Sequence, residues 1–185
     1  MHELGSEGPA FPIVVASGAN GAMPHAHTSD RPVERGETVV VDAGATVGGY
    51  MSDCTRTFAT GALPDDLQRA YDVTLEAQLE GLRATRAGVS GRDADAAARS
   101  AIDAAGFGAA FGHGLGHGLG LLVHEAPVLR PESGDVLVEH NVVTVEPGIY
   151  LSGLGGIRIE DLVVVKEGEP EVLTAAFTKD LVTVD

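Results

Sequence analysis

Two aspartates stand on either side of a glycine-containing stretch that predicts a β-hairpin turn. If the turn centres on Val47 and Gly48, Asp42 lies directly opposite Asp53 on the neighbouring strand. Facing side chains have Cβ atoms about 4.5–5.5 Å apart, and like charges at that distance are destabilising. The pair therefore needs a cation, a shared proton or a different register, and a divalent cation with oxygen ligands is the simplest remedy.

A second hairpin repeats this arrangement with two glutamates. If its turn centres on Gly153, Glu146 lies opposite Glu160, and Arg158 shares the face of Glu160 because strand side chains alternate. The apolar neighbours then point to the other face: Val145, Ile157 and Ile159. Carboxylates on strands are most often solvated, and a bulge would shift the register, so an ordinary outer face remains the alternative.

Three histidines occupy the glycine-rich segment GHGLGHGLGLLVHEAP, at positions 113, 117 and 124. Neutral imidazole is a common ligand for divalent transition metals, and glycine lets the backbone approach a ligand closely. The segment cannot form an ordinary helix, because each glycine costs about 1 kcal/mol there. It is either a nitrogen source for the carboxylate site or a surface loop with adventitious metal affinity.

The elements that position these side chains follow from spacing and caps. Strands are predicted over Phe11 to Ser17, Thr38 to Asp42, Tyr50 to Thr60, Val142 to Leu151 and Ile157 to Val165. Helices are predicted over residues 63–87 and 90–105, where apolar residues recur at helical spacing. Pro64 suits the first helical position, Ser90 an N-cap and Gly106 a helix end. Strands outnumber helices, which favours the α+β class.

Length and charge limit the classes of protein. The chain has 185 residues, which suits a single domain over residues 1–185. Its net charge of −15 repels nucleic acid and anionic membrane. No apolar run approaches the roughly 18 residues of a membrane span. Lys166 and Lys179 are the only lysines, and such an acidic surface favours a halophilic, high-salt cytoplasm.

The compartment is expected to be the cytoplasm. The N-terminus has no basic segment followed by an apolar one, so it does not read as a signal peptide. Cys54 is the single cysteine, which excludes an intramolecular disulfide and agrees with a reducing environment. Its small size and position predict a half-buried strand residue rather than a reactive thiol.

Five ordered motifs resemble those of a known family. They are SGANGAMPHA, VVVDAGATVGGYMSDCTRTF, FGHGLGHGLGLLVHEAP, VVTVEPGIY and GIRIEDLVVV, and they cover the chain from about Ala10 to Val165. Together they closely resemble the Xaa-Pro peptidases, which include prolidase and aminopeptidase P and have the pita-bread fold. The resemblance implies a curved, mostly antiparallel sheet covered by helices.

The resemblance also implies a dinuclear metal site. By position, Asp42 matches a ligand of one metal, and Asp53 and Glu160 match the carboxylates that bridge the two metals. His117 matches the single histidine ligand, and Glu146 matches a glutamate ligand. Two divalent ions are expected, with Mn²⁺ favoured over Mg²⁺ because an imidazole joins the carboxylates. Co²⁺ and Zn²⁺ are the alternatives.

Further residues match the family's catalytic and substrate-binding groups. Glu146 is the expected general base. His25 and His124 match histidines that contact the substrate or stabilise the tetrahedral intermediate, and His113 matches one that lines the substrate pocket. Arg158 matches an arginine beside the second bridging glutamate. The reaction implied is hydrolysis of the peptide bond that precedes proline in short peptides.

Two other functions remain open. Methionine-type aminopeptidases share the five-ligand pattern, but their two glutamate ligands stand farther apart and they usually lack the histidine at position 113. The creatine-hydrolysing relatives lose the metal ligands, which are present here.

Relatives are usually longer, so the chain is expected to be N-terminally truncated, with residues 1–18 as the end of a helix. An inactive metal-binding fragment or binding module is the second alternative. A homodimer could cover the apolar surface that the missing N-terminal helices would leave exposed.

Overall fold

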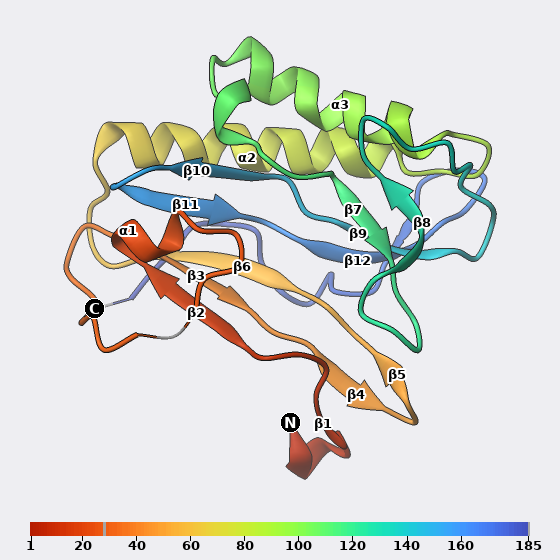
Figure 1. Cartoon of the computed structure of the whole chain (residues 1–185), viewed down its shortest axis with the longest axis horizontal. Helices are drawn as coiled ribbons and strands as arrows, with labels where there is room; N and C mark the ends of the chain where they lie inside the picture. The colour runs from red at the N-terminus through yellow and green to blue at the C-terminus, as the bar shows by residue number, and fades with distance from the viewer. Residues whose placement is uncertain (28, 185) are drawn as a thin grey trace.

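The computed structural model describes residues 1–27 and 29–184, in which the two long helices lie over one side of a layer of strands (Figure 1). The helices are α1 (Gly18–Gly21), α2 (Asp65–Ala84) and α3 (Gly91–Ala104), with 3-10 turns η1 (His2–Leu4) and η2 (Gly108–Ala110). This arrangement of antiparallel sheets and covering helices confirms the α+β class. No helix in the described ranges has both the length and the apolar character that a bilayer crossing requires.

Two larger sheets and two small ones make up the strand layer of the described residues. The first has the order β14-β6-β3-β2, formed by Val182–Thr183, Thr55–Ala59, Thr38–Asp42 and Val14–Ser17. The second has the order β13-β12-β9-β7-β8, formed by Glu171–Val172, Asp161–Val164, Val142–Val145, Gly116–Gly118 and Glu125–Leu129. The small sheets are β1-β4-β5 (Gly8–Pro9, Ala45–Val47, Tyr50–Met51) and β10-β11 (Gly148–Leu151, Gly155–Arg158).

The two long helices confirm the predictions made from spacing and caps. The Ser90 hydroxyl accepts a hydrogen bond from the Asp93 amide at 3.1 Å, as an N-cap does. Gly106 follows the last turn of α3 with a φ of 86°, the left-handed conformation common just after a helix. Pro64 stands one position earlier than predicted, as the N-cap of α2.

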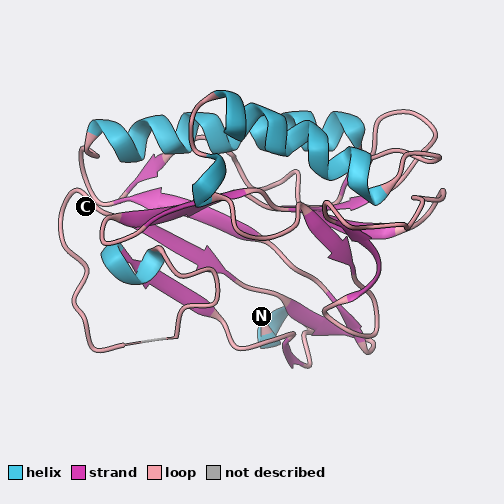
Figure 2. Ribbon diagram, turned by 45° about the horizontal axis from the view of Figure 1, so that its top comes forward, coloured by secondary structure: helices cyan, strands magenta, loops and turns pink. Residues whose placement is uncertain are grey.

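The helices bury their apolar faces against the strands (Figure 2). Glycine at position 81 allows α2 to approach closely, because a Cβ there would meet the Val145 side chain at 3.0 Å and that of Leu115 at 3.2 Å. The fully buried aliphatic side chains of the sheet include Val145, Ile157 and Ile159. These are the residues predicted to point away from the carboxylates, so one side of the second hairpin is core.

The first hairpin differs from its predicted register. Thr46 pairs with Met51, and Asp42 pairs with Thr55 rather than with Asp53. The turn therefore centres between Gly48 and Gly49, whose φ values of 59° and 78° are those of a two-residue turn that favours glycine. The predicted strand from Tyr50 to Thr60 is interrupted at residues 52–54, and Asp53 lies in this interruption.

The second hairpin has the predicted register. Gly148 pairs with Arg158 in the small sheet, and Val145 pairs with Asp161 farther along. Both pairs fit a turn centred on Gly153, whose φ is 78°. Glu146 and Glu160 lie between these paired stretches, outside the strands themselves.

The N-terminal segment is mostly not helical, contrary to the expectation that residues 1–18 end a helix. A 3-10 turn covers His2–Leu4, and residues 8–9 and 14–17 are strands. The strand predicted from Phe11 is shorter, and it is an edge strand on which Val15 is 50% exposed. Pro9 and Pro12 explain the break, since proline cannot donate its backbone nitrogen to a helix or a sheet.

Side-chain hydrogen bonds join the two hairpins. The Thr57 hydroxyl donates to the carbonyl of Arg158 at 2.9 Å and accepts from its amide at 3.0 Å. The Glu160 amide donates to the carbonyl of Thr55 at 3.1 Å. These bonds hold the second hairpin beside β6, and so bring carboxylates that are more than 100 residues apart in sequence to one place.

A buried charge cluster next to this junction predicts a large effect on stability. Asp161 is fully buried and contacts Arg56 at 2.8 Å and Lys179 at 2.6 Å, with further bonds from Gln78 and Thr174. Asp161→Ala leaves two cations without their partner, which costs about 3–5 kcal/mol. We expect the melting temperature to fall by roughly 6–20 °C in differential scanning calorimetry.

The matched control is Glu80→Ala. Glu80 forms an exposed ion pair with Arg83, and such pairs contribute about 0–1 kcal/mol. If Asp161→Ala and Glu80→Ala had the same melting temperature, the role given to the cluster would be contradicted.

Candidate metal centre

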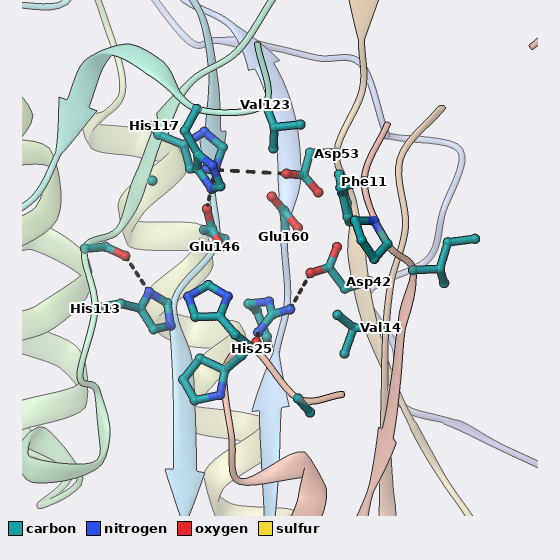
Figure 3. Close-up of a pocket in the computed structure, with 18 of the residues that line it drawn as sticks. Phe11, Val14, His25, Asp42, Asp53, His113, His117, Val123, Glu146 and Glu160 are labelled. Atoms are coloured by element: carbon teal, nitrogen blue, oxygen red, sulfur yellow. Dashed lines mark hydrogen bonds and ion pairs between the residues drawn. The ribbon is translucent and has the colours of Figure 1, made fainter. Parts of the chain in front are cut away.

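Three carboxylates, the half-buried Asp42 and the buried Asp53 and Glu160, converge between the two hairpins (Figure 3). Asp42 ends β3, Asp53 lies in the break after β5, and Glu160 follows β11. One ligand atom from each can be chosen so that all lie within 4.8 Å of one another. Although the register differs from the prediction, Asp42 and Asp53 still meet, because the break before β6 turns Asp53 toward the site.

The oxygens of this group lack the partners that buried polar atoms require. Asp42 Oδ1, Asp53 Oδ1 and Glu160 Oε1 are buried and have no hydrogen-bond partner among the described residues. A buried anion without a partner costs free energy, whereas a cation that prefers oxygen ligands would pair with all three atoms. The donor set therefore fits a divalent cation.

His117 and Glu146 extend the group on one side. His117 Nε2 lies 3.1 Å from Glu146 Oε1 and 4.0 Å from Asp53 Oδ2. The other ring nitrogen, Nδ1, lies 3.0 Å from the carbonyl of Gly118, which can only accept, so Nδ1 carries a proton. Nε2 faces the carboxylates: although burial opposes it, the bond that Nε2 donates to Glu146 and the charge of the neighbouring carboxylates raise the pKa of His117. A metal would take the place of this proton on the Nε2 lone pair, which is the usual arrangement of a metal-binding histidine.

Electrostatics in the metal-free site favour an added positive charge. Burial, with repulsion from Asp42 and Glu146, raises the pKa of Asp53 to about 8. Burial and the same neighbouring carboxylates also raise the pKa of Glu160. Burial works against ionisation of Glu146 too, but the hydrogen bond from His117 together with the positive charges of His117 and Arg158 lowers its pKa to about 2. The raised pKa values of Asp53 and Glu160 show that these buried acids repel one another.

Arg158 lies behind the carboxylates rather than among them. The residue is 4% exposed, and its guanidinium donates to Asp42 Oδ2 at 2.6 Å and to the Thr55 hydroxyl at 3.1 Å. The Thr55 hydroxyl in turn donates to Glu160 Oε2 at 2.7 Å. Arg158 therefore holds one oxygen of Asp42 directly and one of Glu160 through Thr55, while the opposite oxygens stay without partners.

Of the three further histidines, His113 is fixed by hydrogen bonds. Its Nδ1 donates to the carbonyl of Gly114 at 2.7 Å, and Nε2 lies 3.0 Å from the hydroxyl of Tyr150. That hydroxyl accepts from Arg158 at 2.9 Å and can donate onward to His113. Burial lowers the pKa of His113, which keeps the ring neutral and able to accept this bond.

His25 and His124 are exposed on the walls of the same pocket. The ring of His124 is centred 4.3 Å from that of His117, and His25 extends from the loop after α1. The pocket has a volume of about 700 Å³ and is lined by all nine residues proposed from the sequence. These are His25, Asp42, Asp53, His113, His117, His124, Glu146, Arg158 and Glu160.

Three residues of the network were not found from the sequence: Thr55, Thr144 and Tyr150. Their hydroxyls connect residues of the site by hydrogen bonds, but a single threonine or tyrosine on a strand carries no signal of that role. Thr55 is separated by 105 residues from Glu160, so only the folded chain shows the contact.

Known peptidases resemble this chain in sequence and in structure. The Xaa-Pro dipeptidase of Pyrococcus furiosus is 43% identical over 174 residues, which is 94% of this chain and 50% of that protein. The solved Xaa-Pro dipeptidase from Bacillus anthracis superposes with a TM-score of 0.96 and 45% identity, covering 99% of this chain and 51% of that one. The X-Pro aminopeptidase from Thermotoga maritima gives a TM-score of 0.94 and 45% identity, covering 99% and 52%.

The fold is therefore the pita-bread fold of the prolidase-like metallopeptidases, as the sequence motifs predicted. The model of metallopeptidase family M24 matches residues 1–167, and the chain belongs to that family. It spans about half the length of the curated relatives it matches.

Proposed function

We propose that the chain is the catalytic part of a dinuclear metallopeptidase that hydrolyses the peptide bond before proline. The observation that supports this most is the convergence of unpartnered carboxylate oxygens and the His117 lone pair in one pocket of a family M24 fold. Relatives named as Xaa-Pro dipeptidases and aminopeptidases support the same substrate class. Nothing in the geometry favours a methionine-type aminopeptidase or an inactive module over this function.

The proposed ligands are the five donors described above: Asp42, Asp53, His117, Glu146 and Glu160. Bound there, divalent cations would polarise the scissile carbonyl and lower the pKa of the attacking water. Asp53 is close to both Asp42 and His117, and Asp53 and Glu160 are the two carboxylates that we propose would be shared by the ions. Mn²⁺ is the proposed metal, with Co²⁺ or Zn²⁺ as alternatives.

The protein's own groups would perform the proton transfers and orient the substrate. Glu146 would accept the proton of the attacking water, since its carboxylate lines the pocket beside His117. His124 and His25, on the open walls, stabilise the oxyanion and orient the leaving group. His113, neutral and fixed by Tyr150, lines the substrate side of the pocket.

The far wall of the pocket suits an apolar ring. Phe11, Pro12, Ile13, Val123 and Val128 are among the apolar residues that line the pocket. A substrate with its amide at the carboxylates and a nonpolar residue such as proline beside it would bury that residue on this wall.

The test is proline release. We expect the purified chain, in KCl with Mn²⁺, to release proline from the dipeptide Leu-Pro and to lose this activity with EDTA. Met-Ala is the control substrate. Cleavage of Met-Ala alone would favour a methionine-type enzyme, and no turnover by a folded, metal-loaded chain would favour the inactive module.

The acidic surface and the exposed edge strand support two further proposals. A net charge of −15 suits a high-salt cytoplasm, so we expect activity to rise with KCl. The exposed edge of β2, with Val15, suits a homodimer, which sedimentation would detect. Equal activity without salt, and a monomer at all concentrations, would contradict these two proposals respectively.

A further inference from the structure

Thr144 lies under the proposed catalytic carboxylate and takes no part in the function proposed so far. It is a residue of β9, fully buried, and two positions before Glu146. Its neighbours Val143 and Val145 belong to the hydrophobic core, so the alternation of the strand points Thr144 the other way. A buried hydroxyl costs free energy unless it is hydrogen-bonded, which makes its partners informative.

The hydroxyl of Thr144 connects two proposed metal ligands. The backbone amide of His117 donates to Thr144 Oγ1 at 3.1 Å, and Oγ1 donates to Glu146 Oε1 at 2.8 Å. An amide can only donate, so the lone pair of the hydroxyl is used by His117 and its hydrogen is free for Glu146. The direction of both bonds is therefore fixed.

The adjacent glycine shows how closely these strands approach. A Cβ at position 116 would lie 2.0 Å from the carbonyl oxygen of Thr144 and 2.9 Å from Oγ1. Only glycine at this position lets β7 approach Thr144 closely enough for the His117 amide to reach the hydroxyl.

The histidine segment therefore holds Glu146 both at its backbone and at its carboxylate. Its amide donates to the carbonyl of Leu115 at 2.8 Å, and its Oε1 accepts from Thr144 and lies 3.1 Å from His117 Nε2. Within the described part of the chain, no donor reaches the other oxygen, Oε2. Two anchors on one side chain fix which oxygen faces His117 and which is left for a proton or a metal.

We infer that Thr144 is a positioning residue that sets the carboxylate of Glu146 relative to His117. The inference deepens the proposed function and rests on it for the part that concerns turnover. Thr144 acts through Glu146 and His117, and does not itself contact the substrate.

The test compares Thr144→Val, which keeps the shape and removes the hydroxyl, with Thr144→Ser, which keeps the hydroxyl. For Thr144→Val we expect kcat on Leu-Pro and the affinity for Mn²⁺, measured by titration calorimetry, each to fall about 10- to 100-fold, with KM unchanged. Thr144→Ser should restore both. Thr144→Ala removes the same hydroxyl without placing a methyl against the His117 amide, and takes the place of the valine variant if that one does not fold.

Thr74→Val is the matched control. Thr74 is equally buried, and its hydroxyl bonds only to the helix carbonyl of Ala70, at 2.8 Å. Wild-type kcat and Mn²⁺ affinity in Thr144→Val, or an equal loss in Thr74→Val, would overturn the inference. If the unmodified chain releases no proline, the proposed function is wrong, but the inference about Thr144 can still be tested. The Mn²⁺ affinities then decide the role of Thr144, with the same loss and rescue expected.

Discussion

Replacing Glu146 with glutamine is expected to lower kcat for Leu-Pro by about 10²–10⁴-fold, with the fold retained. The amide has nearly the same shape and keeps an oxygen to accept from Thr144, so the backbone bond to Leu115 and the packing of β9 are unaffected. What is lost is the ionised oxygen that accepts a proton. Steady-state kinetics give the effect, and circular dichroism checks the fold.

The matched control is Glu132→Gln, the same chemical change on an exposed residue outside the pocket. It is expected to leave kcat unchanged. Near-normal turnover in Glu146→Gln would refute the base assignment. The metal content of the variant, measured by elemental analysis, would show how far the loss also reflects a weakened ligand.

The elements of the fold were predictable where local signals agreed. The strand Thr38–Asp42 is found with its predicted bounds, and α2 and α3 differ from prediction by one to three residues at each end. The second hairpin has one glycine with positive φ at its centre, so its register could be read from the sequence.

The first hairpin was ambiguous because several glycines stand close together. Gly44, Gly48 and Gly49 all permit a turn, and a one-residue difference in its position changes every facing pair. The meeting of Asp53 with Glu160 is a tertiary contact that the sequence does not show. The predicted register correctly brought Asp42 and Asp53 together, but as a directly facing pair, whereas Asp42 faces Thr55.

Hairpin spacing proposed the four carboxylates, and motif resemblance gave each candidate ligand its expected role. Alternation on a strand brings carboxylates to one face but does not tell a solvated face from a buried site. Burial tells them apart: Asp53 and Glu160 are 6% and 1% exposed. The supporting hydroxyls of Thr55, Thr144 and Tyr150 were not predictable, because each depends on a partner brought near only by folding.

Replacing Asp53 with asparagine should separate metal binding from stability. In the metal-free chain Asp53 is buried beside Asp42 and Glu160, where a third carboxylate adds repulsion and its Oδ1 has no partner. A neutral amide removes that repulsion, so the metal-free variant should melt at or above the temperature of the unmodified chain. This is the opposite of the usual effect of a buried substitution.

The same substitution should abolish the stabilisation by metal. For the unmodified chain, Mn²⁺ at 100 times its dissociation constant adds about 2.7 kcal/mol, a rise of roughly 5–11 °C in melting temperature. Asp53→Asn loses the carboxylate that lies near both Asp42 and His117, so its rise should be small or absent. Asp72→Asn, the same change on the exposed face of α2, should keep the full rise. A variant that melts well below the unmodified metal-free chain and still responds to Mn²⁺ would mean that Asp53 is a structural residue. The unpartnered oxygens around it would then need an explanation other than a cation.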